Sequence, residues 1–199
     1  MPISKAWLIP SLLLLTACGD GFGVTRAAPQ QIMLSDGTVI AGADGWCVDQ
    51  STSRSDGQTS VIVLGSCAAL ARDEDAPRPD VPGIVTVSIE TQPGVTPTAE
   101  ELEAFFASDA GRSALARDGQ AASVEILDTQ IEDDILFLRS RDTSTIVGTD
   151  KQTWRAIFML NGRIASVSLY GRDDRPITPE DGFQAISLQA QELRSANQG

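Results

Sequence analysis

The sequence predicts an α+β fold: a mainly antiparallel sheet with a capped mid-chain helix and a C-terminal helix packed on it. Three observations lead to this class. Short apolar runs are separated by clusters of turn residues, which is typical of hairpin-linked strands. An Asn-Gly pair at 161–162 joins two alternating runs, as in a tight hairpin. Helix-start signals occur in mid-chain and near the C-terminus, so helices do not alternate regularly with strands.

The first hairpin is expected over residues 32–40, because two apolar runs flank the turn cluster Ser35-Asp36-Gly37-Thr38. A short strand then starts at Trp46. Residues 50–58 are polar throughout and have no apolar period, so a loop is expected there. The β-branched run at 60–67 predicts the next strand.

The segment 68–82 contains three prolines and the acidic cluster 73–75, which indicates a solvated loop. A strand is expected next, over 83–89, and residues 92–97 break it. One face of this strand consists of the alternating apolar residues Val85, Val87 and Ile89. The strand should therefore lie with this face on the core.

The mid-chain helix is expected to begin at Thr98, which forms a capping box with Glu101. Its buried face should consist of the apolar residues at helical spacing, Leu102, Phe105 and Phe106. Residues 109–111 are expected to end this helix, and 112–117 to add another turn or two. The two aromatic rings can line a ligand pocket, but packing in the core is the simpler interpretation.

Two further strands are expected at 123–127 and 135–139, on either side of the acidic turn 132–134. A polar loop over 143–152 follows them. These strands add to the antiparallel sheet, because short turns join neighbouring strands in that arrangement.

The clearest hairpin joins 154–160 to 163–170 through the Asn-Gly turn, and a two-residue loop sets its register. One mainly apolar face pairs Leu160 with Arg163, Phe158 with Ala165, Ala156 with Val167, and Trp154 with Leu169. The opposite face pairs Met159 with Ile164, Ile157 with Ser166, and Arg155 with Ser168. This second face is apolar only near the turn, where Ile157, Met159 and Ile164 are candidates for a partner patch. It is either partly covered or partly available to a partner.

The C-terminal helix is expected to start after Thr178, with Pro179 at its first position and acidic residues in its first turn. Its apolar face consists of Phe183, Ile186, Ala190 and Leu193. We expect residues 31–195 to form a single domain and residues 196–199 to fray.

At the N-terminus, Lys5 precedes a short apolar run that ends in Leu15-Thr16-Ala17-Cys18. Residues 1–17 have the pattern of a secretory signal, and their apolar run is too short to span a bilayer. Leu15-Thr16-Ala17-Cys18 resembles the lipobox of bacterial lipoproteins. The resemblance implies cleavage before Cys18 and attachment of lipid to it. A plain secretory signal that precedes a cysteine is the alternative.

The Gly-rich segment 18–30 is then a flexible tether between lipid and domain. Gly19 follows the lipidated cysteine, and in lipoproteins of this type a non-acidic residue there implies sorting to the outer rather than the inner membrane. We therefore expect a periplasm-facing envelope protein held at the membrane by its N-terminal lipid.

The cysteine count agrees with this location. The chain has three cysteines, and lipidation of Cys18 leaves Cys47 and Cys67. In an oxidising compartment, two remaining thiols are most simply explained as one disulfide. Two unpaired buried thiols are the alternative.

The order of elements is similar to that of PsbP-like α/β sandwich proteins. Members often open with a strand that bears a Gly-Trp pair, here Gly45-Trp46, followed by a capped helix, paired strands, a late hairpin and a C-terminal helix. The resemblance covers residues 31–195 and implies an accessory or binding module. It assigns no functional residue.

The amino-acid composition argues against several classes of function. The formal net charge is −12, and so acidic a chain is not expected to bind nucleic acid, which needs clustered Lys and Arg. The chain has no histidine, which removes the usual catalytic triads and zinc sites. The acidic clusters 73–75, 132–134 and 173–174 match no EF-hand spacing, so we expect solvated turns.

From these observations we expect no catalytic residue, metal or cofactor. The expected function is that of a lipid-anchored binding or scaffolding module with an unidentified envelope protein as partner. Two alternatives remain open: an accessory or solute-binding component of a transport system, and a hydrolase that uses two carboxylates brought together by the fold.

Overall fold

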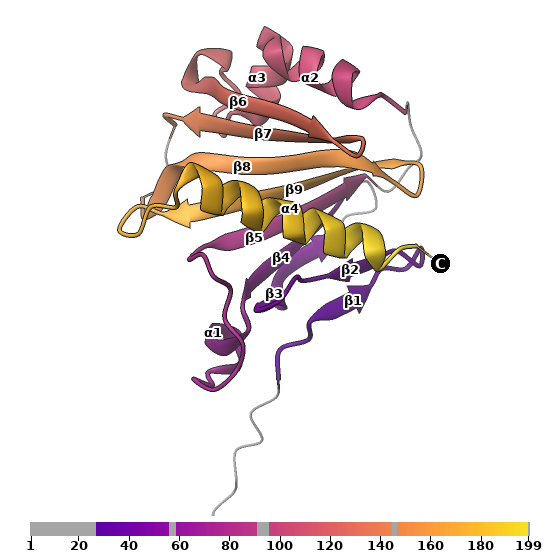
Figure 1. Cartoon of the computed structure of the whole chain (residues 1–199), viewed down its shortest axis with the longest axis vertical. Helices are drawn as coiled ribbons and strands as arrows, with labels where there is room; N and C mark the ends of the chain where they lie inside the picture. The colour runs from indigo at the N-terminus through magenta and orange to yellow at the C-terminus, as the bar shows by residue number, and fades with distance from the viewer. Residues whose placement is uncertain (1–26, 56–58, 91–95, 145–146, 199) are drawn as a thin grey trace, which may run out of the picture.

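The computed structural model describes residues 27–55, 59–90, 96–144 and 147–198, and it confirms the α+β class (Figure 1). The strands are β1 Gln31–Met33, β2 Val39–Ala41, β3 Trp46–Ser55, β4 Thr59–Ser66, β5 Ile84–Glu90, β6 Val124–Glu132, β7 Ile135–Asp142, β8 Thr149–Leu160 and β9 Arg163–Arg172. The helices are α1 Cys67–Ala71, α2 Ala99–Ala107, α3 Asp109–Leu115 and α4 Pro179–Ser195, with a short 3₁₀ turn at Ala121–Ser123.

Seven of the strands form one antiparallel sheet in the order β3-β4-β5-β9-β8-β7-β6, and β1 and β2 form a separate hairpin. Helix α4 lies across β8 and β9 and reaches β2, whereas α2 and α3 pack near β6 and β7 (Figure 1). On β8, Phe158 belongs to the core under α4 and Ile157 packs against Leu102 of α2. Successive residues of a strand point to opposite faces, so the two helical layers cover opposite sides of the sheet.

The main core lies between the sheet and α4. Val85, Val87 and Ile89 of β5 are buried there, as their alternation predicts. Of the predicted apolar face of α4, Ile186, Ala190 and Leu193 are buried and Phe183 is partly buried. Burial of each larger apolar side chain stabilises the fold by about 1.5–3 kcal/mol relative to exposure.

The late hairpin has the predicted register throughout. Leu160 pairs with Arg163, and every pair named above for the two faces is observed. Asn161 and Gly162 have φ values of 52° and 74°, so both residues adopt the left-handed conformation that a type I′ turn requires. Local turn chemistry therefore determines the geometry of the sheet centre.

The strands on either side of the acidic turn are longer than expected, and β6 and β7 meet at a two-residue turn. Asp133 and Asp134 adopt φ values of 50° and 60° there. Short polar side chains tolerate the left-handed region better than most, which explains how two acidic residues replace the usual Asn-Gly. The loop expected over 143–152 is also too long, because β8 already begins at Thr149.

The loop expected at 50–58 is wrong, because β3 continues to Ser55. The Asp49 carboxylate accepts hydrogen bonds from the backbone N–H of Ser51 at 2.9 Å and from the Thr52 hydroxyl at 2.9 Å. The Ser53 hydroxyl accepts a bond from the N–H of Val63 at 3.0 Å. Side-chain oxygens thus support an irregular strand where the β3–β4 register shifts.

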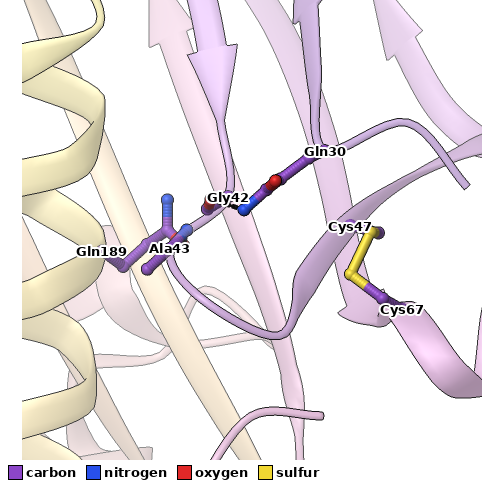
Figure 2. Close-up of a disulfide and its surroundings, with 6 residues drawn as sticks. All are labelled: Gln30, Gly42, Ala43, Cys47, Cys67 and Gln189. Carbon is purple, nitrogen blue, oxygen red and sulfur yellow. Dashed lines mark hydrogen bonds between the residues drawn. A yellow bond between two sulfur atoms is a disulfide. The ribbon is translucent and has the colours of Figure 1, made fainter. Parts of the chain in front are cut away.

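Cys47 and Cys67 form a disulfide, with their Cα atoms 4.8 Å apart (Figure 2). The register places Cys47 opposite Gly65, and Cys67 is two residues further on, at the first position of α1. This short helix lies in the segment that was expected to be loop. Because β3 continues to Ser55 and pairs there with Ser60, Cys47 lies within two positions of Cys67 along β4, which a loop over 50–58 would not allow.

The mid-chain helix has the predicted capping box, in which the Thr98 hydroxyl accepts from the N–H of Glu101 at 3.2 Å and the Glu101 carboxylate accepts from the N–H of Thr98 at 2.9 Å. The helix ends earlier than expected. Ser108 closes α2 and caps α3, since its hydroxyl accepts from the N–H of Gly111 at 3.2 Å. Gly111 permits this sharp junction, because a Cβ there would lie 2.1 Å from the Phe105 carbonyl oxygen.

Both ends of the domain are fixed more firmly than expected. The predicted tether already joins the fold at its C-terminal end, where the Pro29 carbonyl accepts from the N–H of Val48 at 2.7 Å. The Gln30 carbonyl accepts from the N–H of Gly42 at 2.9 Å (Figure 2). The tail expected to fray from residue 196 carries Asn197, which accepts from the N–H of Val39 at 3.0 Å and donates to its carbonyl at 2.8 Å. The predicted signal peptide and Cys18 lie outside the described residues.

Candidate functional site: a groove between α2–α3 and the sheet

A groove of about 840 Å³ lies on the face of the sheet opposite α4. Its floor comes from β5, β8 and β9, and its wall comes from α2 and α3. Its lining includes Thr86, Glu90, Glu101, Leu102, Phe105, Phe106, Ala114, Leu115, Arg155, Ile157, Ile164, Ser166, Ser168 and Tyr170. The volume is within the range of pockets for small organic ligands, roughly 300–1,000 Å³.

The floor of the groove is a set of hydroxyl-bearing side chains. Strand alternation places Thr86 of β5 and Ser166, Ser168 and Tyr170 of β9 on this face, while the intervening residues point into the core under α4. Thr86 and Arg155 are both directly opposite Ser168, on the two neighbouring strands. Adjacent strands lie about 4.8 Å apart, so these polar groups form one continuous surface.

Arg155 supplies the positive charge at this surface. Its Nε donates a hydrogen bond to the Ser168 hydroxyl at 3.2 Å. Its Nη1 is buried and has no hydrogen-bond partner among the described residues. Arg155 also takes part in none of the four ion pairs that the described residues form. A buried charged donor without an acceptor is unfavourable, so an acceptor that enters the groove and reaches this nitrogen would be favoured.

Tyr170 lies next to this guanidinium. Burial raises the pKa of the Tyr170 hydroxyl, but the charge of Arg155 and hydrogen bonds with Arg155, Ser168 and Thr86 outweigh burial and lower the pKa below its usual value. The guanidinium of Arg117 lies over the ring of Tyr170, 5.3 Å from its centroid. The charge of Arg155 therefore acts on the Tyr170 hydroxyl, and both residues line the groove.

The wall of the groove is apolar and partly open. Phe105 and Phe106 meet edge to face, with ring centroids 5.1 Å apart, and Phe105 remains 45% exposed. Phe106 packs against the clusters that contain Leu102 and Leu115. The interpretation of the two rings as core is therefore incomplete, because both also line the groove.

The patch predicted around the hairpin turn is divided by this arrangement. Ile157 is only 2% exposed, because it packs against Leu102 of α2. Ile164 is half-buried and lines the groove, and Met159 is half-buried outside the residues that line it. The structure therefore corrects the idea of a free patch at Ile157, and the alternative of a partly covered face describes this end of the hairpin.

Two carboxylates also line the groove. Glu90 ends β5 and Glu101 belongs to the first turn of α2, and both side chains are exposed. Arg155 is the one cation among the described lining residues, so a half-buried positive charge and two exposed carboxylates line the same groove. Such a distribution disfavours ligands with several negative charges.

A smaller hollow of about 190 Å³ lies between β6–β8 and the start of α4. The indole Nε1 of Trp154 is buried there without a partner among the residues that the structure describes, and a Cβ at Gly182 would lie 2.2 Å from the same indole ring. Arg139 and Arg155 both line this hollow; Arg139 already donates to the Gln152 side chain at 3.0 Å, and Nε of Arg155 donates to the Ser168 hydroxyl on the groove side. The hollow is therefore a weaker candidate than the groove.

The acidic clusters lie apart from the groove. Residues 133–134 form the β6–β7 turn, the Asp73 carboxylate accepts from the N–H of Asp75 at 3.0 Å, and Asp174 pairs with Arg172 at 2.7 Å. Within the described ranges, no group of three or more acidic or cysteine side chains is placed to hold a metal ion. None of the helices described is long and apolar enough to cross a membrane.

Sequence reasoning did not identify the groove, although it placed Arg155 opposite Ser168. The available signal was an arginine in mid-strand whose neighbours on the same face carry hydroxyls. A solvated face of a sheet gives the same pattern. The distinction depends on α2 and α3 covering that face, which is tertiary information.

No protein-family model matches this sequence, and neither does any curated protein. Among solved structures, the solution structure of cyanobacterial PsbP from Synechocystis is similar, with a TM-score of 0.43 and 16% sequence identity. The match covers 89% of this chain and 96% of that one. At this level the similarity transfers no residue role and no function.

Proposed function

We propose that the protein is a lipid-anchored, periplasm-facing envelope protein that binds a small amphiphilic ligand in the groove between α2–α3 and the sheet, without catalysis. The observation that carries the proposal is the buried Nη1 of Arg155, which has no partner within the described structure and belongs to the floor of the groove. A hydrogen-bond acceptor on a ligand would pair with this nitrogen, and the aromatic wall would cover an apolar part of the same ligand.

The two sides of the groove support a ligand with two kinds of surface. The hydroxyls and guanidinium of β5, β8 and β9 favour hydrogen-bond acceptors, whereas Phe105, Phe106 and Ile164 favour apolar groups. Small-molecule sites commonly combine a mainly apolar lining with a few convergent polar groups. This combination favours the solute-binding interpretation over a purely structural scaffold.

The proposed location rests on the N-terminal sequence. The lipobox-like segment before Cys18 supports anchorage by lipid, and Gly19 supports the outer rather than the inner membrane. A disulfide between Cys47 and Cys67 supports an oxidising compartment. The proposed protein thus holds its ligand in the periplasm, close to a membrane surface.

Two alanine-to-tryptophan variants test this function. Ala114 of α3 lines the groove, and Ala104 of α2 is exposed but is not part of the lining. We expect wild-type protein purified from its own envelope to carry a solvent-extractable amphiphile, detected by mass spectrometry. Ala114→Trp should lose most of it, and Ala104→Trp should retain it. An equal load on both variants, or no load on the wild type, would contradict the proposal.

A further inference from the structure

We infer that the groove selects a ligand with a single carboxylate head and an apolar tail, and that the guanidinium of Arg155 binds the carboxylate. This inference rests on the proposed function and specifies the chemistry of its ligand. A medium-chain fatty acid or an arylalkyl acid has the required form. The groove should bind such monoanions more tightly than matching alcohols or phosphate esters.

The geometry at Arg155 favours a carboxylate. The Nε position is occupied by Ser168, which fixes the plane of the guanidinium and leaves Nη1 as the free donor. Planar carboxylates accept from guanidinium nitrogens in a directional, charge-assisted manner. The hydroxyl of Tyr170 is in the same lining and can donate to the second carboxylate oxygen.

The charge balance favours one negative charge rather than two. Arg155 is the one cation among the described residues that line the groove, and a single carboxylate neutralises it; Arg117 contacts the Tyr170 ring but is not part of the lining. A phosphate ester near pH 7 would bring further negative charge towards Glu90 and Glu101, which line the same groove, in a chain of net charge −12. Like charges at short range are disfavoured, so the acidic margin discriminates against polyanions.

The apolar wall sets the preference for the tail. The surface available to it comes from Leu102, Phe105, Phe106, Leu115, Ile157 and Ile164. Each buried methylene strengthens binding by roughly threefold to fourfold. Acetate, which has the head but no tail, should therefore bind far more weakly than octanoate.

Equilibrium dialysis can separate the contribution of the carboxylate head to binding affinity from that of the apolar tail. One chamber holds full-length lipoprotein in non-ionic micelles, and the other holds the same concentration of micelles without protein. Radiolabelled octanoate, octanol, octyl phosphate or acetate is added. We expect octanoate to bind at least about tenfold more tightly than octanol, because charge-assisted hydrogen bonds to the guanidinium are added. Octyl phosphate and acetate should both bind more weakly than octanoate.

Variants assign the selectivity to Arg155. Arg155→Met should reduce octanoate binding to the level of octanol and leave octanol binding unchanged. Arg155→Lys should give an intermediate value, because lysine keeps the charge but not the planar fork. Circular dichroism and thermal melting check that each variant is folded, and Ala104→Trp serves as the unaffected control.

The outcomes separate the two proposals. Equal binding of octanoate and octanol, or tighter binding of octyl phosphate, would overturn the head selectivity, while loss of binding in Ala114→Trp would still support a ligand groove. If neither octanoate nor octanol binds, or if Ala114→Trp binds both as well as the wild type, the proposed function fails as well.

Discussion

Arg155 and Ser168 face each other across the β8–β9 hairpin, with Nε of the arginine donating to the serine hydroxyl at 3.2 Å. The bond fixes the guanidinium on the sheet face opposite α4 and leaves Nη1 buried without an acceptor in the described part of the chain. The Asn-Gly turn sets the register that brings the two residues together. A purely local feature of the chain thereby positions the charge on which the proposed ligand site depends.

Gln189 should be a major stabilising residue of α4. Its side chain is fully buried and accepts from the N–H of Ala43 at 2.9 Å (Figure 2). It also donates to the carbonyl of Ala41 at 2.7 Å. Replacement by alanine leaves both backbone groups unsatisfied, so we expect Gln189→Ala to lose about 2–3 kcal/mol in urea unfolding. Gln191→Ala, on the exposed side of α4, should change stability by less than about 0.5 kcal/mol.

The Asp36–Arg163 ion pair should make stability depend on acid pH. A hydrogen bond from the Arg163 side chain, together with one from the Thr38 backbone, lowers the pKa of Asp36 from 3.8 to about 2. The folded state therefore holds this proton less readily than the unfolded state. The stabilisation is present above about pH 4 and is lost as the pH falls through about 2.

Because the Asp36 side chain is one-third exposed, solvent screening limits the effect to about 1 kcal/mol. Urea unfolding between pH 5 and pH 2 should show about this much additional loss in the wild type relative to Asp36→Asn. Parallel pH profiles for the two proteins would refute this role of the pair.

The Cys47–Cys67 disulfide should contribute to stability by closing a loop with a sequence separation of 20 residues. In the chain-entropy model such a loop stabilises the fold by roughly 3 kcal/mol. The double variant Cys47→Ser/Cys67→Ser should therefore unfold at lower urea concentration, and reductant should affect only the wild type. Alkylation of both thiols in denatured, unreduced protein would show that the bridge is absent.

Lipid anchorage makes a separate prediction about Cys18. Radiolabelled palmitate should enter the wild-type protein, and the wild type should fractionate with outer membranes. Cys18→Ser should incorporate no palmitate and leave the membrane fraction. Labelling of this variant would contradict the lipobox interpretation, and a wild type found with inner membranes would contradict the sorting assigned to Gly19.

The parts of the fold that depend on local chemistry could be predicted from the sequence. The hairpin around Asn161 and Gly162 and the capped helix at Thr98 are determined by residues within a few positions of each other. The length of β3 could not be predicted, because side-chain oxygens of Asp49 and Ser53 stabilise a polar strand whose composition is that of a loop.

The candidate site was only partly accessible to sequence reasoning for a similar reason. Arg155, Ser168 and Tyr170 share a strand face by alternation, and this much can be read from the sequence. That Phe105 and Phe106 lie across this face depends on the junction at Ser108 and on the packing of α2, which involve contacts distant in sequence. A polar face and an aromatic pair therefore became a groove only in the folded chain.

The most direct test of the proposed site is the titration of Tyr170, which is the only tyrosine in the sequence. Phenolate absorbance in the near ultraviolet therefore reports this residue alone. We expect its pKa to lie below 10.0 in the wild type and to rise in Arg155→Met, because burial remains while the positive charge is lost.

A carboxylate bound at Arg155 should raise the pKa of Tyr170 in the same way, because it neutralises the guanidinium. Addition of octanoate should therefore move the absorbance titration of wild-type protein to higher pH. Octanol should not move it, and neither ligand should move the titration of Arg155→Met. An unchanged titration of the wild type at saturating octanoate would contradict the assignment of Arg155 as the group that binds the ligand.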